Sequence, residues 1–422
     1  MAKIIPFKGI LYNPEKVDAS LTVAPPYDIV TPESKEELYL KDPHNIIRID
    51  FGKDSDDDND NENRYTRAAK FLSDWLEEGI IIHDPEPVFY CYEITYQIKG
   101  QEKKTRGFLG VVKIEELGSG KIHPHEMTYS KPKSDRLNVL RYCNANTSPI
   151  FSLYSSVEKT TSFILDDVTK ENPFIEAKDG DGFTHCLWRI SDSAAIEKIT
   201  QEMSDKDVFI ADGHHRYETA LAFKKEMESR GLCKTGEEPF NYVLMFLSNM
   251  EDEGLTLLPT HRIIEADSDI HIKDILKKYF DLQKISSENT SEEQARRQMF
   301  ETMEGNLHSF GMFLTNTGSY YTLSFNGTKV EMDLPECLKT LDVTVLHKYV
   351  FEKLLKIEHY EYEMDPETAV KRAKKGSFEA VFFLNSTKIH DLKEVALAGH
   401  RMPPKSTYFY PKLLTGIVIY MF

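Results

Sequence analysis

The chain has 422 residues, of which 40% are hydrophobic and 29% charged, a composition typical of a globular protein with roughly two or three domains. Its formal net charge of −17 argues against broad electrostatic attraction to nucleic acid or to an anionic membrane. An acidic protein that handles phosphates must gather positive charge and backbone N–H groups in one place. A local cationic cluster is therefore more informative here than in a basic protein.

The five cysteines show no C-x-x-C spacing, which favours reduced thiols over a disulfide framework or a zinc ribbon. The N-terminus lacks a signal-peptide pattern, and no apolar run reaches membrane-spanning length. We therefore expect a cytoplasmic protein without membrane association. The apolar closing segment 413–422 is too short to span a membrane and predicts a buried strand.

Near the N-terminus, Pro25 and Pro26 fix an extended turn directly ahead of Tyr27 and Asp28. Such prolines more often shape a turn than serve chemistry, so a structural role and a substrate-contacting role both stay open. The Asp- and Asn-rich segment 54–63 predicts a solvated loop, because it lacks the glycine that an EF-hand requires. The following amphipathic pattern predicts a helix with one apolar face, formed by Ala68, Ala69, Leu72, Trp75 and Leu76.

Two apolar runs, 87–96 and 105–114, predict a pair of strands joined by a polar turn. The polar segment 121–147 follows and shows little periodicity. It contains His123-Pro124-His125-Glu126. Because alternate residues of an extended chain face the same side, His123 and His125 could converge on a metal ion, although no third ligand is evident.

The same segment supports a second interpretation, in which His123 and His125 contact a substrate. Glu126 would then act as general base, while Lys131 and Arg136 hold a phosphate. A solvated loop with surface ion pairs explains these residues equally well.

The strongest signal is a predicted strand that runs directly into a predicted helix. Val208–Ala211 is apolar and predicts the strand. Four apolar residues spaced three, three and four apart predict the apolar face of a helix that Gly231 ends: Tyr217, Ala220, Phe223 and Met227.

At the junction, the first N–H groups of the helix lack intrahelical partners and carry the positive end of the helix dipole. Gly213 allows a ligand to approach the backbone, and His214, His215 and Arg216 add donors suited to phosphate oxygens. Asp212 could hold Mg²⁺ against that phosphate or accept a proton from an attacking hydroxyl. The alternative is structural: Asp212 caps the helix, His215 packs and Arg216 forms a surface ion pair.

Apolar runs at 241–247 and 256–264 predict further strands. The second run contains His261 and Arg262, which either form a satisfied core pair or place Arg262 against a substrate. Later, Lys405-Ser406-Thr407 has phosphate-binding side chains but lacks the glycines of a P-loop. Fingerprints of dinucleotide binding, of serine hydrolases and of zinc proteases are absent from the sequence.

The segment Gly213-His214-His215-Arg216-Tyr217 resembles the Gly-Cys-His-Arg-Tyr motif of sulfiredoxins and, more loosely, the nucleotide-binding box of ParB proteins. In that superfamily, which includes free serine kinases, the motif opens a helix whose N-terminus binds nucleotide phosphates. An early loop approaches this helix in ParB-like folds, which implies a role for Asp28. His214 replaces the catalytic cysteine of sulfiredoxins, so the resemblance does not imply sulfinic-acid repair.

Over its full length the chain also resembles a bacterial and archaeal family known only as domain of unknown function 1015. The landmarks of this resemblance lie at 24–28, 123–126, 211–216, 258–262 and 403–408. Members of that family are often encoded beside serine-biosynthesis genes, which implies serine or phosphoserine as the substrate.

We therefore expect a mixed α+β protein with a ParB/sulfiredoxin-like nucleotide-binding core, divided into residues 1–155, 156–266 and 267–422. The expected activity is small-molecule phosphotransfer on free serine or phosphoserine, with a nucleotide or pyrophosphate partner and Mg²⁺ as cofactor. Two alternatives stay open: a nucleotide-sensing module without turnover, and a metal-dependent phosphatase built on His123, His125 and Asp212. The sequence does not fix the oligomeric state.

Overall fold

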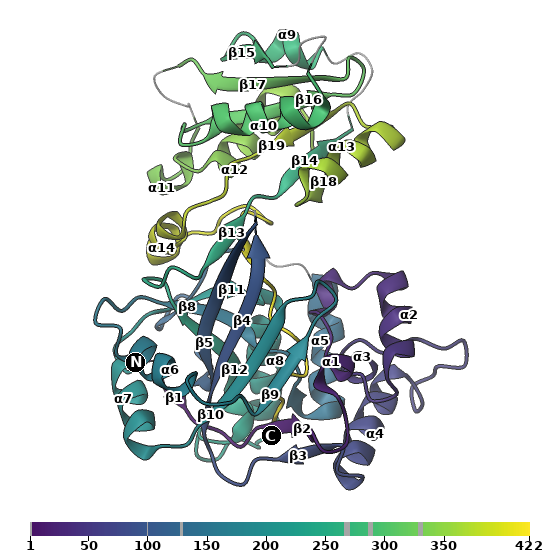
Figure 1. Cartoon of the computed structure of the whole chain (residues 1–422), viewed down its shortest axis with the longest axis vertical. Helices are drawn as coiled ribbons and strands as arrows, with labels where there is room; N and C mark the ends of the chain where they lie inside the picture. Colours follow the sequence, from purple (N-terminus) through teal and green to yellow (C-terminus); the bar gives the residue numbers. More distant parts are fainter. Residues whose placement is uncertain (1, 99, 127–129, 266–270, 286–289, 328–331) are drawn as a thin grey trace. The chain divides into compact units, whose positions relative to one another are not determined.

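The structure is a computed structural model that describes residues 2–98, 100–126, 130–265, 271–285, 290–327 and 332–422, with the backbone alone at 130–132. The chain divides into two compact units. Unit 1 comprises Met1–Pro124, Thr128–Thr256 and Pro411–Phe422, and unit 2 comprises His125–Met127 and Leu257–Tyr410. Both units combine helices with strands, which confirms the mixed α+β class (Figure 1).

Unit 1 is built around a mixed sheet to which nine of the described strands belong. Its order is β6-β11-β8-β12-β5-β4-β10-β9, and β1 pairs with β5. Most neighbouring strands are antiparallel, but β6 runs parallel to β11 and β8 runs parallel to β12. The strands are β1 (Ile4–Ile5), β4 (Phe89–Ile98), β5 (Gln101–Lys113), β6 (Ile122–Pro124), β8 (Ile150–Tyr154), β9 (Ile175–Lys178), β10 (Thr184–Ile190), β11 (Val208–Asp212) and β12 (Tyr242–Asn249).

The strands predicted at 87–96 and 105–114 are present as β4 and β5, which pair antiparallel from Tyr90↔Leu109 to Ile98↔Gln101. The sheet takes strands from both of the regions expected at 1–155 and 156–266. Helices α6 (Thr160–Val168), α7 (Ser193–Met203) and α8 (His214–Ser229) contribute apolar side chains to a core shared with this sheet.

The predicted helix after the acidic loop is α4 (Arg64–Glu77). Asn63 caps it by accepting hydrogen bonds from the backbone of Tyr65 and Thr66, and the Thr66 side chain bonds back to Asn63. Its apolar face packs in a second core together with short helices of the N-terminal region, and its buried residues are Ala68, Leu72 and Trp75. The N-terminal elements include β2 (Ile10–Tyr12), α1 (Ala19–Thr22), the 3₁₀ turn η1 (Tyr27–Ile29), α2 (Pro32–Lys41), α3 (Ile47–Asp50) and β3 (Ile81–His83).

The polar segment 121–147 contains a helix, α5 (Ser130–Cys143). Its buried positions are Arg136, Val139, Leu140 and Cys143. These have the spacing of a helical stripe, but an arginine occupies the first position, where an apolar residue is usual. The arginine at this buried position explains why the sequence shows so little helical periodicity here.

Unit 2 contains a six-stranded sheet in the order β15-β17-β16-β19-β14-β18, antiparallel throughout its described pairs. Two apolar cores pack against this sheet, one formed by the side chains of each face. The strands are β14 (His261–Ile264), β15 (Phe280–Lys284), β16 (Ser309–Leu314), β17 (Ser319–Phe325), β18 (Tyr360–Glu363) and β19 (Ala380–Phe383). The helices include α9 (Ile272–Leu276), α10 (Glu292–Met303), a π-helical segment (Val345–Leu355), α13 (Pro366–Lys375) and α14 (Ile389–Leu397).

Two predicted strands differ from the structure. The run 256–264 is divided into β13 (Thr256–Leu258) and β14, since Pro259 has no N–H to continue a ladder. The closing segment 413–422 is largely buried as expected, but only β21 (Tyr420–Met421) is a strand there.

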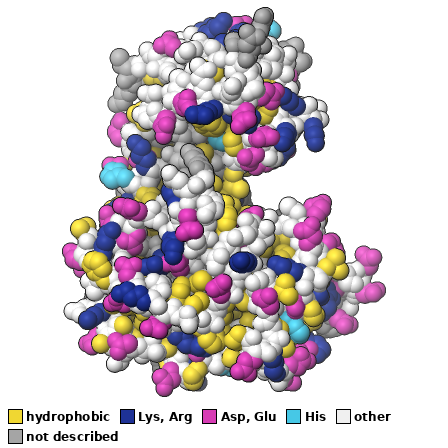
Figure 2. Space-filling view, viewed as in Figure 1, with side chains coloured by type: hydrophobic (Ala, Val, Ile, Leu, Met, Phe, Trp, Pro, Cys, Tyr) yellow, Lys and Arg dark blue, Asp and Glu magenta, His cyan; other side chains and the backbone are white. Residues whose placement is uncertain are grey.

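Among the described residues, all five cysteines are free and no helix is both long and apolar enough to cross a membrane. Figure 2 shows acidic and basic side chains interspersed over the visible face of the described residues.

Candidate functional site

The predicted strand-to-helix turn is present. Strand β11 is buried from Val208 to Ala211, and α8 begins at His214. Between them, Gly213 has φ +95°, a left-handed conformation that favours glycine. The N-cap residue of α8 is Gly213, which has no side chain to cap the helix. The structure therefore confirms the strand and the helix start, with Gly213 rather than Asp212 at the N-cap position.

Arg216 folds back over this turn. A Cβ atom on Gly213 would lie only 2.9 to 3.0 Å from three atoms of the Arg216 side chain. The guanidinium donates to Asp212 Oδ2 at 3.2 Å, to Ser148 Oγ at 2.6 Å and to the carbonyl of Pro149. Gly213 is thus favoured by its conformation, and a side chain there would displace the Arg216 guanidinium from these contacts.

Asp212 lies between two cations. Its Oδ2 faces Arg216, and its Oδ1 lies 3.3 Å from Lys412 Nζ, a lysine whose side chain is only 11% exposed. Two cations already neutralise this carboxylate, which does not favour direct binding of Mg²⁺ by Asp212. The lysine adds a positive charge beside the N-terminus of α8.

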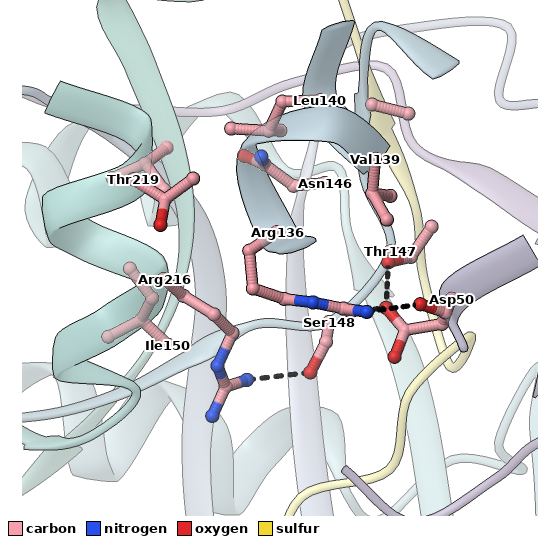
Figure 3. A pocket seen from close by; sticks show the side chains of 12 residues that line it. Asp50, Arg136, Val139, Leu140, Asn146, Thr147, Ser148, Ile150, Arg216 and Thr219 are labelled. Carbon is pink, nitrogen blue, oxygen red and sulfur yellow. Dashed lines mark hydrogen bonds and ion pairs between the residues drawn. The ribbon is translucent and has the colours of Figure 1, made fainter. Parts of the chain in front are cut away.

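Arg216 also lines a small cavity of about 40 Å³. A single water needs roughly 10–15 Å³, so the space suits a group the size of a phosphate rather than a whole nucleotide. Figure 3 shows Arg136 and Arg216 entering it from α5 and α8. Its polar lining residues are Asp50, Arg136, Asn146, Thr147, Ser148, Arg216 and Thr219.

Arg136 is held on the other side of the cavity by two aspartates. Its Nη1 lies 3.0 Å from Asp50 Oδ1 and its Nη2 lies 2.6 Å from Asp135 Oδ2. The guanidinium also stacks over the ring of Tyr27, 4.1 Å from its centroid. Burial lowers the pKa of Arg136, but the carboxylates of Asp50 and Asp135 raise it more, so this residue stays cationic.

Tyr27 lies within electrostatic range of both arginines. Burial raises the pKa of its hydroxyl to about 12, and the charges of Arg136 and Arg216 oppose this increase. The structure therefore brings together three residues that the sequence singled out at widely separated positions. Asp28 follows Tyr27 in η1 and is exposed.

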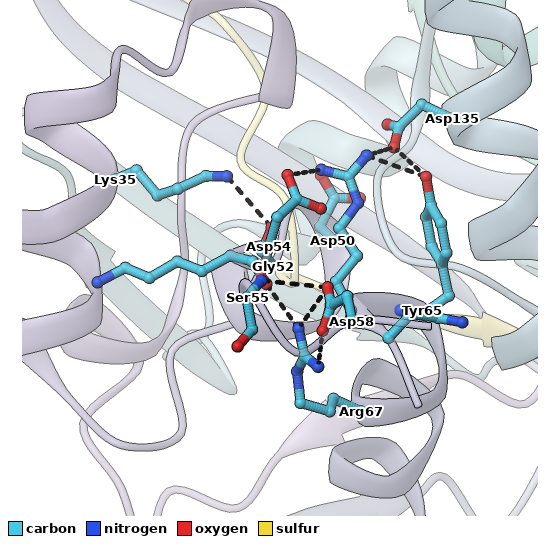
Figure 4. A network of polar contacts seen from close by, with 12 residues as sticks. Lys35, Asp50, Gly52, Asp54, Ser55, Asp58, Tyr65, Arg67 and Asp135 are labelled. Atoms are coloured by element: carbon cyan, nitrogen blue, oxygen red, sulfur yellow. Dashed lines mark hydrogen bonds and ion pairs between the residues drawn. The ribbon is translucent and has the colours of Figure 1, made fainter. Parts of the chain in front are cut away.

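A polar network extends from Asp135, the partner of Arg136, toward the acidic loop 54–63 (Figure 4). The hydroxyl of Tyr65 donates to Asp135 at 2.9 Å, and Arg64 forms an ion pair with the same carboxylate. Arg136 lowers the pKa of Asp135, overcoming the increase that burial causes. These contacts fix the helix α5 against α4.

Asp50 has one polar atom without a partner. Thr147 Oγ1 donates to Asp50 Oδ1 at 2.6 Å, but Oδ2 is buried and has no hydrogen-bond partner among the described residues. Leaving such an acceptor unsatisfied costs about 1–3 kcal/mol. Since Asp50 lines the cavity, this oxygen is suited to a hydroxyl or ammonium group bound there.

Sequence reasoning missed Asp50, Ser148 and Lys412. Asp50 and Ser148 stand in segments with no recognisable motif, and only the fold brings them beside the arginines. Lys412 carried a weak signal, since it is a single charge directly ahead of the apolar closing run.

The two histidines of the motif differ in exposure. His214 is 7% exposed and His215 is partly exposed, while neither lines the cavity. The carbonyl of His215 accepts a hydrogen bond from Thr219 Oγ1 at 2.6 Å.

His123 lies on β6, paired with Phe209 of β11. Its Nε2 is 2.7 Å from Asp207 Oδ1, and its ring stacks on Phe209 with centroids 5.3 Å apart. Asp207 precedes β11, whereas Asp212 ends it. The imidazole of His123 is therefore directed away from the Asp212 turn.

His125 and Glu126 belong to unit 2. There His125 Nε2 is 2.8 Å from Thr407 Oγ1, and Glu126 Oε1 accepts from the backbone of Ser406 at 3.2 Å. The two histidines thus contact different partners. Among the described residues, no group of three or more His, Cys, Asp or Glu side chains could hold a metal ion.

Two further residues, Lys131 and Arg262, are also predicted to belong to the site. The side chain of Lys131 lies outside the described part of the chain. Arg262 is completely buried in unit 2, where it donates to His347 Nε2 at 2.8 Å and to the carbonyl of Lys405 at 3.0 Å. These are the contacts of a core residue whose donors are hydrogen-bonded. The partner imidazole is that of His347 rather than that of the adjacent His261.

A model of the family described as "Protein of unknown function (DUF1015)" matches residues 4–344. No curated protein gives a significant match to the chain.

Several solved structures show weak similarity, and three of them illustrate it. A "Free serine kinase in complex with AMP" is 14% identical, with 70% of this chain and 92% of that chain covered and a TM-score of 0.34. "SbnI with C-terminal truncation" from Staphylococcus aureus is 10% identical, with coverages of 70% and 82% and a TM-score of 0.34. A conserved hypothetical protein from Pyrococcus furiosus is 16% identical, with coverages of 68% and 87% and a TM-score of 0.31. Scores of this size do not bear on the function of this chain.

Proposed function

Because the chain belongs to the DUF1015 family, whose description assigns no function, we propose a function from the site itself. We propose that the chain is a small-molecule phosphotransferase that acts on free serine or phosphoserine, with a nucleotide or pyrophosphate as the other substrate. The phosphoryl group would bind between Arg136 and Arg216, beside the N-terminus of α8. The single observation that supports this most is that both arginines line one phosphate-sized cavity.

The arrangement suits the chemistry of phosphoryl transfer, which depends on positioning and on stabilising charge on the transferred group. Arg136 and Arg216 present planar guanidinium groups that match phosphate oxygens. Ser148 adds a hydroxyl donor at the same cavity. In this proposal Asp212 positions Arg216 and Lys412 through its two carboxylate oxygens.

The acceptor would be a hydroxyl compound that also carries an ammonium group. Asp50 Oδ2 is buried at the cavity without a partner among the described residues, so it can accept a hydrogen bond from either group. We propose Asp28 as the proton acceptor, because the adjacent Tyr27 lies near both arginines. The choice of serine rests on the resemblance of the Gly213–Tyr217 motif to a superfamily that includes free serine kinases.

Mg²⁺ would enter with the polyphosphate substrate. It keeps several waters and binds mainly phosphate oxygens in such sites, which requires few protein ligands. We therefore expect activity to depend on added Mg²⁺ and to disappear with a chelator.

The test is Arg216→Ala, with serine phosphorylation and phosphoserine dephosphorylation assayed against ATP, ADP and pyrophosphate. Loss of a side chain that stabilises transition-state charge lowers kcat by about 10²–10³-fold. Arg141→Ala is the matched control, because Arg141 lies on α5, pairs with Glu226 of α8 and does not line the cavity. This control should keep full turnover and change stability by less than about 1 kcal/mol.

Circular dichroism and thermal denaturation would show that both variants remain folded. Unchanged kcat in folded Arg216→Ala would contradict the proposed site. Tight nucleotide binding by the wild-type chain without turnover with any donor would instead indicate a nucleotide sensor. No described contact supports the phosphatase built on His123, His125 and Asp212.

A further inference from the structure

A second cavity lies at the other end of β12 in unit 1. Its volume is about 210 Å³, considerably larger than the first. Val243, near the start of β12, lines the first cavity, and Ser248, near its end, lines the second. The second is bounded by β5, by helix α6 and by the turn after β12, and its lining residues are Lys104, Arg106, Ser162, Leu165, Asp166, Ser248, Asp252, Gly254 and Leu255.

One wall of this cavity carries two cations, and a buried carboxylate holds both of them in position. Lys104 and Arg106 are alternate residues of β5, so both face the same side of the sheet. Glu93 of β4 is only 5% exposed and bonds to both, at 3.0 Å to Lys104 Nζ and 2.7 Å to Arg106 Nε. Arg106 also forms an ion pair with Asp166 of α6.

A different wall carries a carboxylate, Asp252. Its Oδ2 accepts a hydrogen bond from Ser162 at 2.9 Å, and its Oδ1 lies 3.2 Å from Lys159 Nζ. The turn that carries it is firmly held, because the carbonyl of Gly254 accepts from Thr105 Oγ1 at 2.7 Å. A Cβ atom on Gly254 would lie 1.9 Å from the carbonyl oxygen of Lys104, so this turn fits directly against β5.

The cavity is therefore polar and pre-organised, with two cations on β5 and a carboxylate on the turn after β12. We propose that it binds a small zwitterionic metabolite, one that carries a carboxylate and an ammonium group. The carboxylate would contact Lys104 and Arg106, and the ammonium would contact Asp252. Leu165 and Leu255 provide apolar surface for a short side chain.

The charge pattern disfavours simpler ligands. A plain anion would meet Asp166 and Asp252, two carboxylates that line the cavity beside the two cations. A plain cation would meet Lys104 and Arg106 on β5. Only a ligand with both charges gains at both walls, since each charge then has an opposite partner.

The probe is L-alanine, measured by calorimetry against propionate, which lacks the ammonium, and ethylamine, which lacks the carboxylate. Alanine has no hydroxyl and cannot be a phosphoryl acceptor, so its binding is separable from the proposed phosphotransfer. On the full chain we expect alanine to bind at least about tenfold more tightly than either single-charge analogue. Propionate binding as tightly as alanine, or no detectable binding of alanine, would overturn the proposal.

The variants are Lys104→Met and Asp252→Asn, each expected to weaken alanine binding by about tenfold. Lys103→Met is the control, because Lys103 adjoins Lys104 on β5 but does not line the cavity. Arg216→Ala serves as the control for the first cavity. Alanine affinity that is unchanged in both test variants, or that falls in Arg216→Ala, would reject the second site.

Discussion

At the scale of single residues, Gly213 joins two requirements that normally occur apart. Its φ of +95° is one that side chains rarely adopt, and its missing Cβ leaves space for the guanidinium of Arg216. Gly236 has a similar φ of +76° but open space around it. Comparing the two glycines separates backbone strain from contact with Arg216.

Gly213→Ala should lower the free energy of unfolding by about 1–3 kcal/mol through backbone strain and by a further amount through displacement of Arg216. Gly236→Ala should cost only the strain. Chemical denaturation of both variants measures the difference. Equal losses in the two variants would mean that Arg216 moves aside freely, contrary to the close packing of this turn.

Single residues also show which parts of the candidate site could be predicted from the sequence and which could not. The strand, Gly213 and the helix start were predictable, because a buried apolar run and a helical repeat meet at one glycine. Asp50 was not, since a buried carboxylate has no local pattern and its partners Arg136 and Thr147 are distant in sequence. The pairing of Tyr27 with Arg136 likewise depends on tertiary packing alone.

At the scale of elements, strand β14 contributes to an unusual buried polar cluster of unit 2. His261 Nδ1 accepts the backbone N–H of Leu384 at 3.4 Å, and His347 Nε2 accepts from Arg262 at 2.8 Å. Both imidazoles must be neutral to accept. Burial, reinforced by the charge of Arg262, lowers the pKa of His261 to about 3 and that of His347 to about 2.

This cluster predicts acid sensitivity. Both pKa values are lower in the folded protein than in the unfolded chain, where they are about 6.5. The unfolded chain therefore binds more protons below pH 6.5, so the stabilisation is complete above that pH and declines as the pH falls. Each histidine should cost about 1.4 kcal/mol of unfolding free energy per pH unit below 6.5.

Urea denaturation between pH 7.5 and pH 5 checks this slope. His347→Gln keeps an acceptor for Arg262 without a titrating group, so its slope should be shallower by one histidine's contribution. The control is His390→Gln, since the side chain of His390 is 78% exposed. An unaltered slope in His347→Gln would exclude His347 as a source of the acid sensitivity.

Element prediction succeeded where the sequence has a run of apolar residues, as in β4 and β5, or an apolar helical face, as in α4. It missed α5 because Arg136 occupies a buried position of the helical stripe. It joined residues 256–264 into a single strand, because hydropathy alone does not show that Pro259, which has no N–H, interrupts the hydrogen bonds between strands.

At the scale of the whole molecule, residues 411–422 belong to unit 1 although unit 2 lies between them and the remainder of that unit in sequence. Five aliphatic side chains of this segment are at most 3% exposed: Leu413, Leu414, Ile417, Val418 and Ile419. Burial of each contributes about 1.5–3 kcal/mol, and together they amount to on the order of 10 kcal/mol. That sum is comparable to the net stability of a typical domain, about 5–15 kcal/mol.

A chain ending at residue 410 should therefore leave unit 1 unfolded or only marginally stable, while 257–410 retains its own sheet and cores. Amide hydrogen exchange resolves the two units in one experiment. Removal of Phe422 alone is the control, because that side chain is partly exposed. Full protection of β11 and β12 in the shortened chain would contradict the expected role of the segment.

Because residues 411–422 belong to unit 1, the order of synthesis also determines when that unit can be completed. A ribosome makes the strands of the nine-stranded sheet first, then all of residues 257–410, and only afterwards Lys412 and the apolar residues behind it. The carboxylate of Asp212 cannot gain its lysine partner until translation has passed this point. Until the second unit has emerged, nascent chains lack the buried side chains of 411–422, and we expect chaperones to bind them during this interval. A chain released early would carry Arg216 and Arg136 but would lack Lys412, the second cationic partner of Asp212.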